Sequence, residues 1–281
     1  MKNFKEKLSF NYNKNKSILC IGLDPDLNLM PVSNITIFNK EIIDATKDFA
    51  CAYKPNLSFY EALGSNGIKS LEETLEYIRK NAPGKLIIGD GKRGDIGSTN
   101  KKYAEAFFKT WGFDAITVNP FAGQESFEPF IEYKDKGIFL WCKSSNAKSE
   151  EFQNKKIIHN DKTMKFYEWI AKRANKWNKH NNIALIVGAT YPKELKEIRD
   201  ISPKLPMLIP GIGAQKGSIE KVITASINPS ENEPNIMISA SRSILYASNN
   251  KSDYPEKAQK VAKSLNDQIN FYIKQLKDKA L

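Results

Sequence analysis

Long apolar runs are missing from this chain of 281 residues. No stretch approaches the roughly 20 consecutive apolar residues that a membrane-spanning helix needs. The first seven residues, MKNFKEK, also lack the apolar core of a secretory signal peptide. We therefore expect a cytoplasmic protein that has no membrane partner.

Cysteine and histidine are scarce. The three cysteines, Cys20, Cys51 and Cys142, are an odd number, and each lies in an apolar run, which favours reduced, buried thiols over a disulfide framework. The two histidines, His159 and His180, lie in polar sequence that is typical of a surface. Since neither residue type falls in a cluster with the spacing of metal ligands, we expect no metal site and no cofactor.

Arginine is scarce too, although the net charge is +11. Only five of the 43 basic residues are arginine, and the lysines are spread along the whole chain. A protein that binds nucleic acid would carry clustered arginines beside aromatic platforms, and this pattern is absent from the sequence. We therefore expect no nucleic-acid partner, and a basic surface that favours a small anionic ligand.

Eight short apolar runs recur along the chain, and most are separated by helical patterns. This alternation is typical of a parallel sheet. Eight strand–helix units in a chain of this length predict a single (β/α)8 TIM barrel over residues 1–281, and the Gly-x-Gly-x-x-Gly fingerprint of a Rossmann fold is absent after the first run. The expected strands are Ile18–Leu23, Phe49–Lys54, Leu86–Asp90, Ala115–Asn119, Ile138–Cys142, Ile183–Val187, Met207–Ile209 and Ile236–Ser239.

Helices are expected where apolar residues recur at helical spacing, over residues 70–80, 103–111, 166–177 and 255–276. Ser70 and Glu73 have the spacing of a capping box, which predicts that the first of these helices begins at Ser70. Gly112 is expected to end the second helix. The polar segment Lys143–Lys162 is predicted to be a loop over the mouth of the barrel.

Charged residues gather where the second and third expected strands end. In a TIM barrel the chemistry lies at the C-terminal ends of the strands. Asp90 and Lys92 are two residues apart, so both side chains are expected to enter one cavity, close to Lys54 and Asp95. A structural salt bridge explains Asp90 and Lys92 alone equally well, but four charges crowded together are costly as mere scaffold, because each must be desolvated.

A second polar group follows the seventh and eighth expected strands, where this fold commonly binds phosphate. Gly211 and Gly213 allow backbone N–H groups to approach phosphate oxygens, and Arg242 can donate two hydrogen bonds to them. An ordinary turn would explain the two glycines alone. Their pairing with Arg242 favours a phosphate site.

Four motifs extend from the first expected strand to the last. They are Gly22–Pro25 (GLDP), Lys54-Pro55, Asp90–Ile96 (DGKRGDI) and Pro210–Gln215 (PGIGAQ). On these residues the chain resembles orotidine 5'-monophosphate decarboxylase, and it is most similar to the longer bacterial subgroup. The resemblance implies decarboxylation of orotidine 5'-monophosphate to UMP, the last step of de novo pyrimidine nucleotide synthesis, without a metal or cofactor.

The resemblance also implies a role for each matching residue. The catalytic network would comprise Lys54, Asp90, Lys92 and Asp95, with Lys92 as the proton donor to C6 of the pyrimidine. The enzyme would be a homodimer in which Asp95, Ile96 and Thr99 reach the neighbouring subunit's site. The substrate-binding residues would be Asp24, Lys54, Ile96, Thr99, Ser145, Gly211, Gly213, Gln215 and Arg242.

Two positions depart from the usual pattern of this family. Ala147 stands where the family usually has proline, and Ser241 stands where it often has glycine before the phosphate-binding arginine. Neither departure concerns the four charged residues of the expected network.

A metal-dependent sugar-phosphate aldolase of the hexulose-phosphate synthase type is the alternative function. It resembles this chain in the Asp-x-Lys-x-x-Asp pattern of the third strand. However, it needs an acidic metal ligand on the second strand, where this chain has Lys54, whose ammonium would repel a divalent cation.

Overall fold

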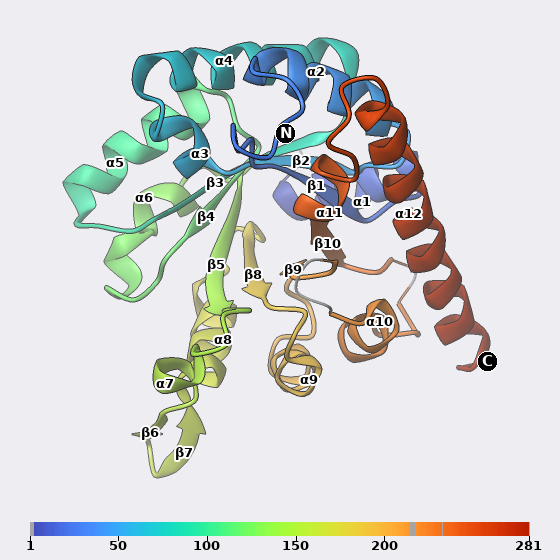
Figure 1. The fold of residues 1–281 in the computed structure, drawn as a ribbon. Coiled ribbons are helices and arrows are strands. Elements are labelled where there is room, and N and C mark those ends of the chain that lie inside the picture. Colours follow the sequence, from blue (N-terminus) through green and yellow to red (C-terminus); the bar gives the residue numbers. More distant parts are fainter. Residues whose placement is uncertain (1–2, 214–216, 232, 281) are drawn as a thin grey trace.

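A closed barrel of eight parallel strands forms the centre of the molecule (Figure 1). The computed structural model describes residues 3–213, 217–231 and 233–280. The strand order around the barrel is β1-β10-β9-β8-β5-β4-β3-β2, and the barrel closes where β1 pairs with β10, with Leu19 opposite Ile238. The barrel strands are β1 (Leu19–Leu23), β2 (Ala52–Pro55), β3 (Leu86–Arg93), β4 (Ala115–Val118), β5 (Gly137–Lys143), β8 (Ile183–Val187), β9 (Met207–Pro210) and β10 (Ile236–Ala240).

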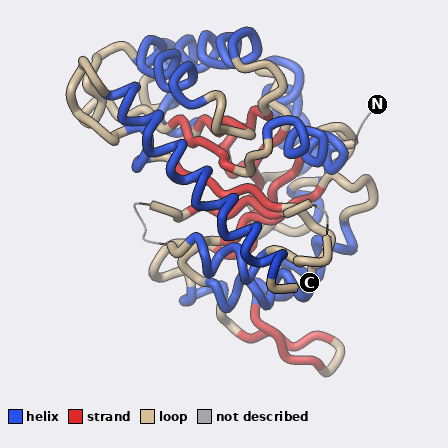
Figure 2. Tube along the Cα trace, turned by 90° about the vertical axis from the view of Figure 1, so that its right-hand side faces the viewer, coloured by secondary structure: helices blue, strands red, loops and turns tan. Residues whose placement is uncertain are grey.

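All eight expected strands are present, so the TIM-barrel prediction is confirmed. Figure 2 shows the barrel strands at the centre with helices around them. The helices are α1 (Phe4–Asn15), α2 (Ile35–Thr46), α3 (Leu57–Glu61), α4 (Gly64–Asn81), α5 (Gly97–Glu105), α6 (Glu128–Ile131), α7 (Glu150–Gln153), α8 (Phe166–Trp177), α9 (Pro192–Ile201), α10 (Ile219–Ser226), α11 (Arg242–Leu245) and α12 (Tyr254–Asp278), with a π-helical turn η1 (Ala106–Thr110) and a 3-10 turn η2 (Gln124–Ser126).

The predicted start of the helix at Ser70 is wrong, because α4 begins at Gly64 and Ser70 lies inside it. Glu73 does not cap the helix but accepts a hydrogen bond from Thr36 on α2. The earlier start has a packing reason. A Cβ atom at Gly67 would lie only 1.9 Å from the carbonyl oxygen of Tyr60 on α3, so the first turns of α4 press closely on α3. The expected end near Gly112 is confirmed by its left-handed φ of 65°.

Helix α1, which the sequence did not predict, packs against residues of the barrel interior. The ring of Phe4 meets the ring of Phe139 edge-on, with 5.6 Å between centroids. Gly137, at the N-terminal start of β5, leaves room for Phe4, since a Cβ there would lie 2.5 Å from the ring. The N-terminal end of the barrel is thus filled by apolar packing, and the C-terminal end is left for a polar site.

The segment expected as a loop over the mouth contains α7 and β6 (Lys156–His159), which forms an antiparallel hairpin with β7 (Lys162–Lys165) at the segment's end. Its turn residues Asn160 and Asp161 both have positive φ, as a two-residue type I′ hairpin turn requires. The hairpin projects away from the barrel in both views (Figures 1 and 2). The prediction of a single covering loop is therefore wrong for most of the segment.

The three cysteines are free and buried, as expected. His159 is exposed on the hairpin and its ring lies 4.3 Å from the ring of Trp169. Within the described part of the chain, no helix is both long enough and apolar enough to span a membrane.

Candidate active site

A cavity of about 250 Å³ opens among the C-terminal ends of the barrel strands. Seven of the residues predicted for the site line it, together with residues that the sequence did not single out. The lining residues are Asp24, Lys54, Asp90, Lys92, Thr117, Trp141, Lys143, Ser144, Ser145, Asn146, Ile186, Leu208, Pro210, Gly211, Ile212, Ser239, Ser241, Arg242 and Ser243.

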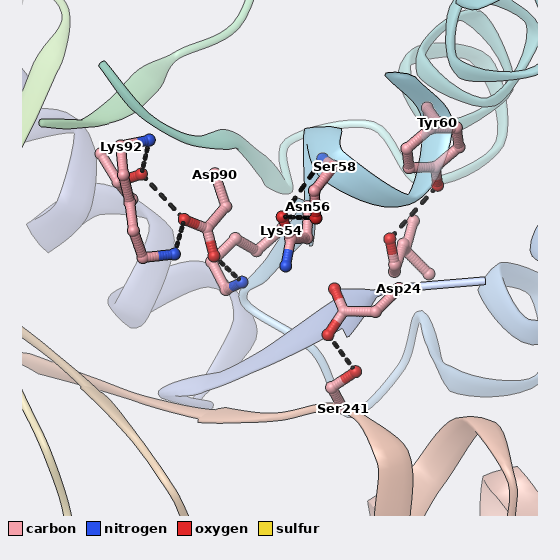
Figure 3. A network of polar contacts seen from close by, with 10 residues as sticks. Asp24, Lys54, Asn56, Ser58, Tyr60, Asp90, Lys92 and Ser241 are labelled. Atoms are coloured by element: carbon pink, nitrogen blue, oxygen red, sulfur yellow. Dashed lines mark hydrogen bonds and ion pairs between the residues drawn. The ribbon is translucent and has the colours of Figure 1, made fainter. Parts of the chain in front are cut away.

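Asp90 and Lys92 meet in one cavity, as the spacing predicted, and Asp90 lies between Lys92 and Lys54 (Figure 3). Its Oδ2 atom is 2.5 Å from Nζ of Lys54, and its Oδ1 atom is 2.8 Å from Nζ of Lys92. Lys54 and Asp90 are only 7% and 8% exposed, whereas 38% of the Lys92 side chain is exposed. The ammonium of Lys92 is therefore the member of the trio that a bound molecule can reach most readily.

The burial of these charges shifts their ionisation. Burial alone would raise the pKa of Asp90, but the charges of Lys54 and Lys92 outweigh it and hold that pKa well below its usual range. Burial would likewise lower the pKa of Lys54, but Asp90 and then Asp24 overcome this effect and raise it. Asp90 and Lys54 thus stay charged across the neutral range because each is the other's partner.

The local backbone explains how Asp90 and Lys92 meet. The prediction assumed a regular strand, but the register of β3 against β4 shifts between Gly89 and Arg93, and Lys92 has a left-handed φ of 44°. Thr117 on β4 supports this irregular stretch, since its Oγ1 atom donates to Asp90 Oδ1 and accepts from the backbone N–H of Lys92. The shared cavity was predicted correctly, and the β-bulge that produces it was not.

Asp24 follows β1 and faces the same cavity. Its Oδ2 atom accepts a hydrogen bond of 2.7 Å from Ser241 (Figure 3), whereas its Oδ1 atom is buried and has no partner among the described residues. The hydroxyl of Tyr246 donates to the carbonyl oxygen of Asp24 and accepts from the N–H of Asp26. The carboxylate is thereby held in place with one oxygen left for a ligand.

The predicted phosphate-binding residues approach one another at the ends of β9 and β10. Gly211 and Gly213 have φ angles of 109° and 97°, which glycine adopts without strain. A Cβ at Gly213 would lie 2.6 Å from Oγ of Ser243, next to Arg242, so the two loops are in close contact. Gly213 does not itself line the cavity. Gln215 lies outside the described residues.

Besides Gly213, three predicted residues lie outside the cavity of their own chain: Asp95, Ile96 and Thr99. Asp95 is exposed and its Oδ1 atom accepts from the backbone N–H of Ile96, whose side chain is 68% exposed. Within one chain the charged cluster is therefore Lys54, Asp90 and Lys92, without Asp95.

The sequence interpretation missed several residues of the site. Thr117 and Trp141 lie on strands whose apolar pattern conceals them, although Nζ of Lys92 is only 5.8 Å from the centre of the Trp141 ring. Lys143 was considered only as the first residue of the segment expected as a loop, yet it is fully buried at the end of β5. A lysine directly after an apolar strand was the available signal for its position.

Comparison with known proteins shows to which family this barrel with its charged cavity belongs. The family model described as "Orotidine 5'-phosphate decarboxylase / HUMPS family" matches residues 17–256. The chain belongs to this family. It is similar to the orotidine 5'-phosphate decarboxylases of Dehalococcoides mccartyi (49% identity, 96% of this chain and 98% of that protein) and Thermomicrobium roseum (41%, 99% and 98%). The OMP decarboxylase structure from Leishmania donovani superposes with a TM-score of 0.83 at 32% identity, covering 97% of this chain and 99% of that one.

The metal-dependent alternative finds no support in these comparisons, whose named relatives are decarboxylases. The second strand ends in Lys54, which donates to Asp90 where the alternative needs an acidic metal ligand. In addition, the described residues contain no group of three histidine, cysteine, aspartate or glutamate side chains arranged to hold a metal ion.

The pairing of Asp90 with Lys54 and Lys92 leads to a prediction for the variant Asp90→Asn. The substitution leaves Lys54 buried without its anion, so we expect the free energy of unfolding to fall by about 3 kcal/mol at pH 7. The pKa of Asp90 is lower in the folded protein than in the unfolded chain, where a carboxyl group has a pKa of about 4. The ionised Asp90 therefore contributes fully to the free energy of unfolding above pH 4, and this contribution is lost progressively as the pH falls below that value.

Urea unfolding of both proteins between pH 3 and pH 8 tests this expectation. The gap between them should be constant above pH 5 and should narrow below pH 4. Asp267→Asn, which removes an exposed ion pair with Lys263 on α12, is the control and should cost less than about 1 kcal/mol. A gap that stays the same down to pH 3 would show that the ionisation of Asp90 does not stabilise the fold.

Proposed function

We propose that this cavity decarboxylates orotidine 5'-monophosphate to UMP, with Lys92 as the proton donor to C6. The observation that carries the proposal is the Lys54–Asp90–Lys92 cluster, in which a buried carboxylate holds an accessible ammonium at the cavity wall. The reaction agrees with the family to which the chain belongs. In this proposal, residues 1–281 form one decarboxylase domain. The protein acts in the cytoplasm, where thiols stay reduced, and its three free cysteines support that location.

The chemistry explains why such a cluster is needed. Loss of CO2 from C6 leaves a vinyl carbanion without an adjacent π-acceptor, so the surrounding charges must stabilise it. The ammonium of Lys92 faces the electron pair left on C6 and then donates the proton that replaces CO2. Asp90 lies beside the departing carboxylate and fixes Lys92, while Lys54 keeps Asp90 ionised.

The remaining contacts hold the rest of the nucleotide. Oδ1 of Asp24, which is buried and has no partner among the described residues, would accept a hydrogen bond from a ribose hydroxyl. Lys54 would contact the ribose as well, and Ser145 would contact the pyrimidine. Arg242 and the backbone of Gly211 and Gly213, together with Gln215, would bind the phosphate. Binding energy gained far from C6 thereby positions the reacting carbon against Lys92.

A homodimer completes the site in this proposal. Asp95 and Ile96 are exposed on the loop after β3, and Thr99 lies on the first turn of α5. None of the three lines the cavity of its own chain. We infer that they reach the nucleotide bound by the partner subunit, where Asp95 joins the charged cluster.

An absorbance assay that follows the conversion of orotidine 5'-monophosphate to UMP tests the reaction. The activity should survive exhaustive chelation with EDTA, because every charge that the mechanism needs comes from lysine and aspartate. A chelated enzyme that is inactive and that Mg²⁺ restores would overturn this metal-free mechanism, and Mg²⁺-dependent aldol activity without any UMP formation would favour the aldolase alternative.

The substitution Lys92→Ala should abolish turnover while UMP still binds. The residues that would contact the ribose and phosphate of UMP lie on other strands and remain intact in this variant. The affinity for UMP should therefore change by less than about tenfold. Calorimetry with UMP provides the measurement. Loss of UMP affinity in step with activity would make Lys92 a structural residue.

Mixed dimers test the shared site. A dimer of one Lys92→Ala chain and one Asp95→Ala chain has one site with both lesions and one site built from wild-type groups only. An even, random mixture of these chains should therefore recover roughly a quarter of the normal activity, since half of the dimers have one intact site of two. Each variant alone should be nearly inactive. Verified mixed dimers without any recovery would show that Asp95 acts in its own subunit.

A further inference from the structure

Lys143 is a buried lysine at the active-site cavity to which the mechanism gives no role. It ends β5, is fully buried and borders the cavity. Burial lowers the pKa of this ammonium. A cation in such a position is costly unless its donors are satisfied, so its partners show what it does.

The partners of Lys143 belong to the segment that follows it, residues 144–154. Its Nζ atom donates to Oγ of Ser149 and to Oδ1 of Asn154, each at 3.0 Å. Both acceptors are neutral side chains on either side of the short helix α7. One ammonium thus ties together the two ends of α7 and holds them against the end of β5.

The aromatic ring of Tyr191 forms another contact with Lys143. Its centre lies 4.5 Å from Nζ, within the range of a cation–π interaction. The hydroxyl of Tyr191 donates to the carbonyl oxygen of Asn146, at 3.0 Å. Tyr191 therefore joins the buried ammonium to the part of the segment that lies beside the cavity.

The start of this segment forms one wall of the cavity. Ser144, Ser145 and Asn146 all line it. The backbone of Ser145 lies so close to Gly188 that a Cβ at Gly188 would be 2.7 Å from it, and the N–H of Ser144 donates to the side chain of Gln153, next to Asn154. The cavity wall is therefore packed on β8 from one side and anchored to α7 from the other.

We propose that Lys143 is a positioning residue that holds residues 144–154 so that Ser144 and Ser145 meet the pyrimidine ring. It acts through Ser149, Asn154 and Tyr191 and does not touch the reacting atoms. This inference rests on the proposed function, because it takes the 144–146 wall as the side of the cavity that receives the base. It predicts that Lys143 contributes to the binding of the base and does not contribute to the binding of the phosphate.

The variant Lys143→Met keeps an unbranched side chain of similar length but releases both acceptors. We expect the KM for orotidine 5'-monophosphate and the Kd for UMP to rise about tenfold, which corresponds to about 1.4 kcal/mol, while kcat changes less than about threefold. The Kd for ribose 5-phosphate, which has no base, should be unchanged. Lys148→Met, at an exposed lysine of the same segment, should behave as the wild type.

A second variant keeps the test decisive if Lys143→Met folds poorly. Asn154→Ala removes one acceptor and should weaken UMP binding without affecting ribose 5-phosphate, and the double variant should bind UMP no more weakly than Lys143→Met alone. Equal losses for UMP and ribose 5-phosphate, a collapse of kcat at constant KM, or unchanged UMP binding would each overturn the proposal. Failure of the wild type to form UMP would instead refute the proposed function, and the two binding constants would still be measurable.

Discussion

The site depends on one buried carboxylate that has a lysine on each side. Asp90 stays ionised only because Lys54 and Lys92 outweigh the cost of burying it. Conversely, Lys54 remains charged in a buried position because Asp90 accepts its hydrogen bond. Removal of one partner leaves an uncompensated charge in the barrel, so the three groups form a single electrostatic unit.

The barrel brings the residues of this electrostatic unit together. Parallel strands bring the ends of β2, β3 and β4 side by side, so Lys54, Asp90 and Thr117 meet although they are far apart in the sequence. The bulge in β3 turns Lys92 back toward Asp90, and Thr117 secures its backbone. Where β1 ends, next to β2, the hydroxyl of Ser241 donates to Asp24 and fixes its carboxylate. Among these groups, the ammonium of Lys92 and Oδ1 of Asp24 are left for a ligand.

Much of this arrangement could be predicted from the sequence, because buried parallel strands are short apolar runs and charged residues at their ends stand out. The spacing of Asp90 and Lys92 predicted one shared cavity, although the bulge in β3, and not a regular strand, brings the two side chains together. Thr117 and Lys143 could not be assigned, since their roles depend on which strands are neighbours and on local bulges. The β6–β7 hairpin escaped prediction because its strands are polar and exposed, and the start of α4 because packing against α3 extends the helix beyond Ser70.

In the proposed mechanism, the ammonium of Lys92 faces negative charge that develops at C6. Calorimetric comparison of UMP with a UMP analogue that has an anionic oxygen at C6 tests it most directly, because that oxygen occupies the place of the carbanion's electron pair. The analogue should bind the wild type at least about a hundredfold more tightly than UMP, and Lys92→Ala should lose this preference. Equal affinity of the wild type for both nucleotides, or a preference that persists in Lys92→Ala, would contradict the account.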